Sequence, residues 1–384
     1  MLDSTPLRSL IGSIPLFLAL GCGGSTPATP DAAVVALDAG DVDAAAPRRL
    51  AFTAGPAYPA ALAYATATIL PVGTQRYLYV VGGADATATA LNTVTAACAR
   101  AEIHADGTLG DWEDAGAIDG GSGPFPLVGH GALRLNGDLG EVGIAVAGGG
   151  GPSGALPFVL SGFVQSDGTL GAWGRYDPTL DGAQSFGAFV PFEAHQLALV
   201  GGLTGPQGLD PTDRVVVAAI MNGTTSPTWR TGPSLPVPRF GHAWTRWNDQ
   251  LYVVGGENAS GGVAEVLRAT RDAGLEVNGW AIAGTLLTTT SFPAVLARND
   301  ELWILGGIDG GRATGSASSR VARAPIGADG HLGDFARVAG GDLPLPIAAS
   351  AVAYDDETGH VYLVGGLTGA PLAATDRVIV GTLP

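Results

Sequence analysis

A few polar side chains near short apolar runs are the residues of this chain best able to do chemistry. Imidazole, guanidinium and carboxylate groups can move protons, hold a metal or bind a ligand, depending on their spacing. The six histidines are dispersed, and no nucleophile stands beside a base at a recognisable spacing. The sequence therefore predicts ligand binding, with no catalytic residue, no metal and no cofactor. The candidate binding residues are Asp85, His130, Arg239, His242, Glu257, Asn258 and Asp309.

The charge balance narrows the class of partner. All 19 basic residues are arginine, and 35 acidic residues bring the net charge to −16. Nucleic acids require a basic surface, so this balance excludes them as partners. The glycine run Gly148–Gly151 lacks the spacing and the lysine of a phosphate-binding loop, so it indicates the end of a strand. Protein and glycan ligands remain open.

The N-terminal residues 1–22 are predicted to be an export signal. Arg8 precedes an apolar stretch from Leu10 to Leu20, and the stretch ends in Leu-Ala-Leu-Gly-Cys at Cys22. This ending resembles a bacterial lipobox, whose cysteine is acylated; the alternative is an ordinary cleaved signal. The resemblance implies a lipoprotein of the bacterial cell envelope, on the outer membrane and either periplasmic or surface-exposed. It would touch the membrane only through its lipid anchor.

Residues 23–47 are rich in Ala, Gly, Pro, Asp and Thr and show no periodicity, which predicts a disordered tether. Residues 48–384 are expected to form one domain, most simply a monomer. Cys98 has no disulfide partner if Cys22 is acylated, so we expect it to be a small buried apolar residue.

An apolar run followed by two glycines occurs six times in the predicted domain. The second glycines of successive copies are 66, 53, 54, 51 and 59 residues apart. A period near 50 residues with one strand-like run in each unit predicts stacked β-units. The copies are LYVVGG (78–83), GIAVAGG (143–149), LALVGG (197–202), LYVVGG (251–256), LWILGG (302–307) and VYLVGG (361–366).

The repeat unit is clearest from Pro236 to Trp280. Residues 239–247 alternate as in a strand, Asn248-Asp249 favour a tight turn, and 250–256 form the second strand. A third strand at 263–271 and a fourth around Trp280 complete an antiparallel sheet. Six such sheets can bury their faces only by packing radially. The sequence therefore predicts an all-β, six-bladed β-propeller of four-stranded antiparallel sheets.

The last unit is expected to borrow its outer strand from the N-terminal end of the domain. That unit stops after its third strand, at Pro384, and residues 49–56 resemble the fourth-strand segment 228–233. Pairing of residues 49–54 with the last strand would remove an exposed sheet edge.

The apolar run, the glycine doublet and a tryptophan 24 to 29 residues later resemble the kelch-repeat family over residues 48–384. The resemblance implies a divergent bacterial kelch-like propeller. It is informative about the fold and not about the activity, because propellers host many unrelated functions.

The predicted topology sorts the loops onto two faces. Loops after each glycine doublet and loops before each first strand share one face, which we call the upper face. The repeated turns DGTLGDW (106–112), DGTLGAW (167–173) and DGHLGDF (329–335) share the opposite, lower face. All seven candidate residues lie on or near the upper face. Because binding sites favour varied loops on a rigid scaffold, we expect the ligand there.

Two further functions remain open beside a binding module for a protein or glycan. N-acetylneuraminate epimerase is a six-bladed kelch protein, so the resemblance also allows a carbohydrate-active enzyme of that type. A buried carboxylate clustered with arginine at the upper mouth of the axial channel would favour the enzyme. An apolar or shallow mouth would favour the binding module. The remaining alternative is a structural envelope lipoprotein without a discrete ligand.

Overall fold

The computed structural model describes residues 50–384, except 88–89, 137–140, 152–153, 156–158, 177–183, 194–195, 205–208, 220–228 and 272–276. The predicted signal, Cys22 and the tether lie outside the described residues. All regular secondary structure in the described part is β-strand, which confirms the all-β prediction. A helix long and apolar enough to cross a membrane is not found there.

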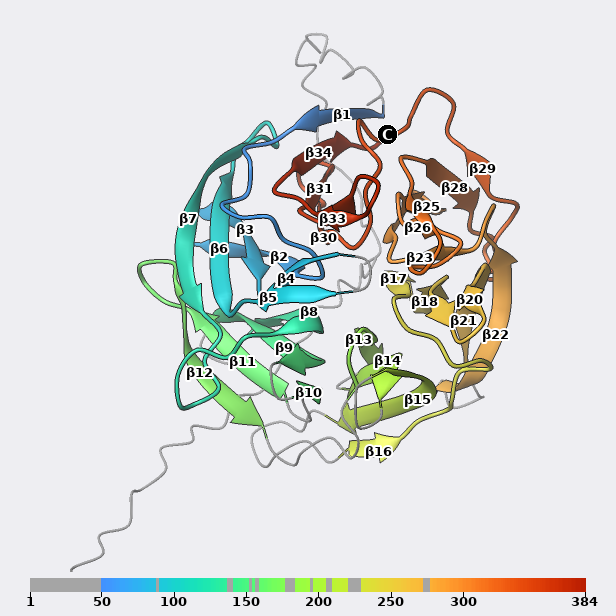
Figure 1. The fold of residues 1–384 in the computed structure, drawn as a ribbon, viewed down its shortest axis with the longest axis horizontal. Helices are drawn as coiled ribbons and strands as arrows, with labels where there is room; N and C mark the ends of the chain where they lie inside the picture. The colour runs from blue at the N-terminus through green and yellow to red at the C-terminus, as the bar shows by residue number, and fades with distance from the viewer. Residues whose placement is uncertain are drawn as a thin grey trace, which may run out of the picture.

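Six antiparallel sheets, each with four main strands, stand in a ring around a central axis (Figure 1). The first strand of each sheet lies near the axis and the fourth lies at the rim. Blade 1 contains β2 (Thr66–Val72), β3 (Gln75–Val81), β6 (Ala97–Ile103) and β7 (Leu109–Ala117). Blade 2 contains β8 (Val128–Asn136), β9 (Val142–Gly151), β11 (Val159–Val164) and β12 (Leu170–Tyr176). Blade 3 contains β13 (Ala188–Glu193), β14 (Gln196–Thr204), β15 (Asp210–Ala219) and β16 (Trp229–Thr231).

The second half of the chain repeats this arrangement. Blade 4 contains β17 (Ala243–Trp247), β18 (Gln250–Val254), β21 (Glu265–Arg271) and β22 (Val277–Thr285). Blade 5 contains β24 (Ala294–Arg298), β25 (Glu301–Leu305), β28 (Val321–Pro325) and β29 (Ala336–Arg337). Blade 6 contains β30 (Ala351–Asp355), β31 (His360–Val364), β34 (Val378–Thr382) and, as its outer strand, β1 (Ala51–Ala54).

The outer strand of blade 6 comes from the other end of the domain, as the sequence predicts. β1 pairs antiparallel with β34, from Ala51 opposite Thr382 to Ala54 opposite Ile379. The pairing covers an edge of β34 that would otherwise present unpaired backbone groups.

The glycine doublets end the second strands because the backbone there turns into a left-handed conformation. Gly255 and Gly256 have φ angles of 60° and 103°, which residues with a side chain rarely adopt. A Cβ atom on Gly255 would also lie 2.3 Å from the carbonyl oxygen of Thr290, on the next blade. The doublet therefore lets neighbouring blades approach closely at the top of each sheet.

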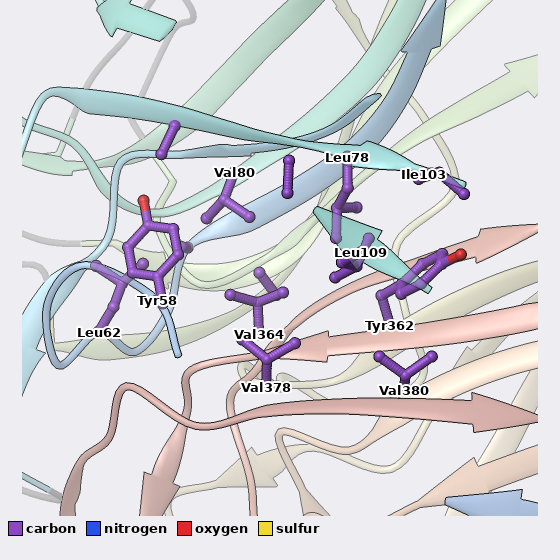
Figure 2. Close-up of a cluster of buried hydrophobic side chains, with 14 residues drawn as sticks. Tyr58, Leu62, Leu78, Val80, Ile103, Leu109, Tyr362, Val364, Val378 and Val380 are labelled. Carbon is purple, nitrogen blue, oxygen red and sulfur yellow. The ribbon is translucent and has the colours of Figure 1, made fainter. Parts of the chain in front are cut away.

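Apolar side chains fill the wedges between neighbouring blades. Figure 2 shows the wedge between blades 6 and 1, where Leu78 and Val80 of β3 face Val364 and Val378. Burial of each such side chain stabilises the fold by about 1.5–3 kcal/mol. Cys98 is buried in the next wedge, between blades 1 and 2, in agreement with its expected role.

The repeated Asp-Gly turns of the lower face have a structural role. In three blade pairs, a tyrosine of one second strand donates a hydrogen bond to the glycine carbonyl of such a turn in the next blade. Because this contact needs the same turn each time, it explains why the turns resemble one another. The pairs are Tyr79–Gly168 at 2.6 Å, Tyr252–Gly330 at 2.7 Å and Tyr362–Gly107 at 2.9 Å.

Short strands form a second tier on the upper face. All except β23, which precedes the first strand of blade 5, follow the glycine doublets, and most make small hairpins (Figure 1). In blade 4, for example, Phe240 bridges Glu257, so the loop before the first strand meets the loop after the doublet as predicted. The short strands are β4 (Ala84–Ala86), β5 (Leu91–Val94), β10 (Gly154–Ala155), β19 (Glu257–Asn258), β20 (Gly261–Gly262), β23 (Thr290–Ser291), β26 (Ile308–Asp309), β27 (Ser316–Ala317), β32 (Leu367–Thr368) and β33 (Ala373–Ala374).

Candidate functional site

A closed ring of backbone hydrogen bonds surrounds the axis just below the upper face. Each blade contributes one residue, placed immediately before the innermost strand or within its first residues, with a φ angle between 51° and 59°. The amide of each residue donates to the carbonyl of the equivalent residue in the preceding blade, at 2.6–3.1 Å. Left-handed backbone is costly for residues other than glycine, so the ring holds its four non-glycine positions under local strain. The six ring residues are Tyr64, Gly129, Phe186, Gly241, Phe292 and Ala349.

Aromatic and small residues alternate around this ring, and the three aromatic rings meet on the axis. The ring centroid of Tyr64 lies 5.2 Å from those of both Phe186 and Phe292, which are 6.1 Å apart. All three contacts are edge-to-face, the geometry that aromatic pairs favour. Gly129 and Gly241 leave room for the phenylalanine rings, since a Cβ atom on either glycine would lie within 2.7 Å of such a ring. We call Tyr64, Phe186 and Phe292 the aromatic triad.

A hollow of about 160 Å³ extends from the aromatic triad along the axis. Its walls include His130, His242, Pro293 and Ser350, each one residue after a ring position. The first strands run from the upper face towards the lower face, so these residues place the hollow below the triad. The triad therefore separates the upper mouth from the channel inside the propeller.

His130 and His242, two predicted site residues, are buried in the wall of this channel. Each packs its Cε1 atom against the first glycine of the preceding blade's doublet, Gly82 or Gly201. Thr66 Oγ1 lies 2.9 Å from Nε2 of His130. Burial is the main reason that the pKa of both imidazoles is lowered to about 3, and nearby Arg239 contributes to the shift of His242. Both rings are therefore neutral at physiological pH, and the structure does not place them in the upper mouth.

Arg239 is also held inside the protein, with only 1% of its side chain exposed. Its Nη1 atom donates to the carbonyl of Gly255 at 3.2 Å, and Nη2 lies 3.6 Å from Glu265 Oε2. Its own backbone amide donates to Thr212 in blade 3. Burial lowers the pKa of the guanidinium, and Glu265 opposes that shift. Arg239 thus braces blade 3 against blade 4.

Glu257 lies on β19 in the upper tier, beside the blade 5 loop that carries Arg312. Its Oε2 atom accepts a hydrogen bond from the backbone amide of Arg312 at 2.8 Å and lies 3.7 Å from Nε of the same residue. The carboxylate therefore fixes the blade 5 loop that carries Arg312. Gly310 and Gly311 turn this loop with φ angles of 85° and 94°.

Arg312 lies over the aromatic floor of the upper mouth. Its guanidinium carbon is 4.5 Å from the centre of the Phe240 ring and 5.9 Å from that of Phe292. Such cation–π contacts orient the charged group while leaving one side open. About a quarter of the side chain, 26%, remains exposed. Burial raises the pKa of the Tyr64 hydroxyl to about 12, and that hydroxyl lies beside Arg312 and near Glu257. We call Tyr64, Glu257 and Arg312 the mouth cluster.

The remaining predicted residues occupy separate hairpins of the upper tier. Asp85 is exposed on β4, and its carboxylate accepts a hydrogen bond from Asn92 at 3.2 Å. Asn258 caps the tip of the β19–β20 hairpin by accepting from the amide of Ser260. Asp309 pairs with Arg320. The three side chains thus belong to upper-tier hairpins of blades 1, 4 and 5.

Sequence reasoning missed Tyr64 and Arg312. Tyr64 does carry a signal, because the alternation of aromatic and small residues before the first strands is visible in the sequence. Arg312 has none, since Tyr64, Phe240 and Glu257 beside it come from blades 1 and 4. Within the described part of the chain, no group of three or more His, Cys, Asp or Glu residues could hold a metal ion.

Comparisons with known proteins support the propeller fold. No family model matches the chain. A kelch repeat-containing protein from Arabidopsis thaliana is 30% identical over 114 residues, which cover 29% of this chain and 26% of that protein. The match thus spans about a quarter of the curated relative. The solved structure of YjhT superposes with a TM-score of 0.62 at 14% identity, over 86% of this chain and 97% of that chain. The chain has a kelch-like fold, and neither similarity assigns it an activity.

Proposed function

We propose that this protein is an envelope-anchored binding module that recognises a protein or glycan through the upper face of its propeller. The observation that carries the proposal is the aromatic triad. Tyr64, Phe186 and Phe292 close the axis immediately below the upper mouth, so the mouth is a shallow, aromatic-floored surface and not a deep reaction chamber. A shallow rim of separate hairpins on a rigid ring suits recognition of an external ligand.

The contacts of the candidate residues support the same reading. The two histidines and Arg239 are engaged with neighbouring blades, which gives them structural duties. The exposed or partly exposed polar groups at the upper face include those of Asp85, Asn258 and Arg312. The ligand would therefore be bound by the mouth cluster and the hairpins around it.

A bulky label on either face tests this proposal. In the full-length Cys22→Ala protein, Cys98 is the only other cysteine and is buried, so one added cysteine can be labelled alone. Ser260→Cys places a polyethylene-glycol maleimide at the tip of the β19–β20 hairpin. Thr74→Cys places the same label on the lower face, in the turn between β2 and β3.

Partner capture from envelope extracts of the native host is then measured for both labelled proteins. The proposal expects the Ser260 label to abolish capture and the Thr74 label to leave it intact. The reverse pattern would assign binding to the lower face. If neither the labelled nor the unlabelled protein enriches any partner or glycan, the structural envelope role without a discrete ligand is favoured instead.

A carbohydrate-active enzyme is the second candidate, and the mouth cluster is the observation that favours it. A carboxylate, a guanidinium and a protonated phenol lie together, as acid–base chemistry on a sugar would require. Against this, the Glu257 carboxylate is already engaged by the amide of Arg312. Incubation with acidic and neutral sugars, with Glu257→Gln as the control, tests for turnover; product formation that Glu257→Gln abolishes would support the enzyme.

A further inference from the structure

The upper mouth contains a positively charged group whose orientation is fixed before any ligand arrives. Glu257 holds the backbone of Arg312, and Phe240 and Phe292 lie against the guanidinium from below. The exposed quarter of the side chain therefore faces solvent at the upper mouth. This arrangement reduces the entropy that Arg312 would lose on binding, which is the general benefit of preorganisation.

The chemistry of this position matches a carboxylate. The planar guanidinium presents paired N–H donors, whose spacing suits two carboxylate oxygens. The Tyr64 hydroxyl stays protonated at physiological pH and can donate a further hydrogen bond from beside Arg312. Because Glu257 is directed to the amide and Nε side of Arg312, the other edge of the guanidinium is the one available to a ligand.

The surroundings favour a sugar over a protein as the carrier of that carboxylate. Hot spots of protein interfaces usually contain exposed aromatic side chains. The exposed large hydrophobic residues of the described chain include none of these; they are Leu91, Leu209, Val237, Ile282 and Leu287. One guanidinium with one hydroxyl donor beside it matches the carboxylate and a neighbouring hydroxyl of a single acidic sugar unit.

We propose that Arg312 and Tyr64 form an anion subsite that binds the carboxylate of an acidic glycan at the upper mouth. This proposal rests on the upper face being the binding face and adds the chemical class of the ligand. It assigns Arg312 the role of the charged anchor, Tyr64 that of a second donor, and Glu257 that of a positioning residue.

The test measures binding of a galacturonate oligosaccharide and of its methyl ester to the full-length protein by calorimetry. The ester keeps the sugar and removes the charge. We expect the acid to bind more tightly than the ester, and Arg312→Met to weaken acid binding by about 10- to 100-fold, as for loss of a charge-assisted bidentate pair. Arg312→Lys keeps the charge without the planar donors, so it should lose only part of the affinity.

Arg323→Met is the matched control, because Arg323 also lies on an aromatic ring and pairs with a glutamate. Its guanidinium carbon is 5.2 Å from the Trp303 ring, and Nη1 is 2.9 Å from Glu301 Oε2. It belongs to β28, away from the mouth cluster, and its replacement should leave binding unchanged. Urea unfolding of each variant shows whether a loss of binding reflects a loss of fold.

Equal binding of acid and ester, or full binding by Arg312→Met, would overturn the anion subsite while leaving the upper-face function intact. Absence of binding of any uronate at millimolar concentration would overturn the proposed ligand class. Binding of peptides with a free carboxyl terminus in place of uronates would assign the subsite to a protein ligand. Loss of partner capture from a lower-face label would instead refute the proposed function itself.

Discussion

The backbone amide of Tyr64 donates a hydrogen bond to the carbonyl of Ala349 at 3.0 Å, which joins the first blade to the last at the axis. This contact completes the ring of six backbone hydrogen bonds. Together with the β1–β34 pairing at the rim, it joins the two ends of the domain both at the axis and at the outer edge. The axial closure fixes the three aromatic side chains and, through Phe292, the floor beneath Arg312.

The aromatic triad depends on glycine at the intervening ring positions. Gly241→Ala should destabilise the fold by about 1–3 kcal/mol, because the new Cβ would meet the Phe292 ring at 2.5 Å. Gly73→Ala is the control, since Gly73 has a φ of 61°, close to the 59° of Gly241, but nothing lies within 4 Å of its Cβ position. Urea unfolding measures both variants. Equal losses would mean that the backbone conformation, and not the ring contact, causes the effect.

The two buried histidines predict a loss of stability in mild acid. Their pKa values in the folded state are about 3, below the ordinary value of 6.5, so the unfolded chain binds more protons between these limits. The stability is complete above pH 6.5 and falls as the pH decreases, by about 2 kcal/mol for each histidine at pH 5. The decrease in the free energy of unfolding between pH 7 and pH 5 should be smaller in His242→Gln than in the wild type. The exposed His331→Gln is the control, and an unchanged loss in His242→Gln would contradict the assignment.

Closure by β1 predicts a sharp boundary for N-terminal truncation. Removal of residues 23–46 should leave the melting temperature nearly unchanged, because it spares β1. Removal of residues 23–56 should lower it by several degrees or cause aggregation, since the edge of β34 becomes exposed. Identical melting temperatures for the two truncated proteins would show that the β1–β34 pairing does not stabilise the domain.

The predicted lipobox concerns a part of the chain outside the described residues. Cys22→Ala should release the protein from membranes and abolish labelling with a fatty-acid analogue, because the acyl chains are the proposed anchor. Membrane fractionation after expression in the native host provides the measurement. A wild-type protein that is already soluble, with an unmodified N-terminus, would exclude the lipoprotein.

Features that follow from the repeat pattern or from local backbone conformation were predictable, and side-chain contacts between residues distant in the sequence were not. The doublet Gly255–Gly256 and the turn at Asn248 follow from local backbone needs, and the structure has both. The burial of Arg239 depends on carbonyl groups of another part of blade 4, and the position of Arg312 depends on Phe240 and Tyr64. Residue type and loop position alone could not distinguish the buried arginine from the exposed one.

The structure places the seven predicted site residues in different surroundings. Glu257 belongs to the mouth cluster, whereas Asp85, Asn258 and Asp309 lie on hairpins around it. His130 and His242 combine a polar side chain with a place against a neighbouring glycine doublet, which a single sequence does not reveal. Replacement of Arg239 would therefore probe the joint between blades 3 and 4 more directly than it would probe ligand binding.

Hydrogen–deuterium exchange with and without the captured ligand shows which face of the propeller binds it. If the ligand binds the upper face, exchange should be slower in the β4–β5 and β19–β20 hairpins and in the 308–317 loop that carries Arg312. The turns at Gly107, Gly168 and Gly330 should be unchanged on the lower face. Protection of those turns, with no change in the upper hairpins, would show that the ligand binds the lower face.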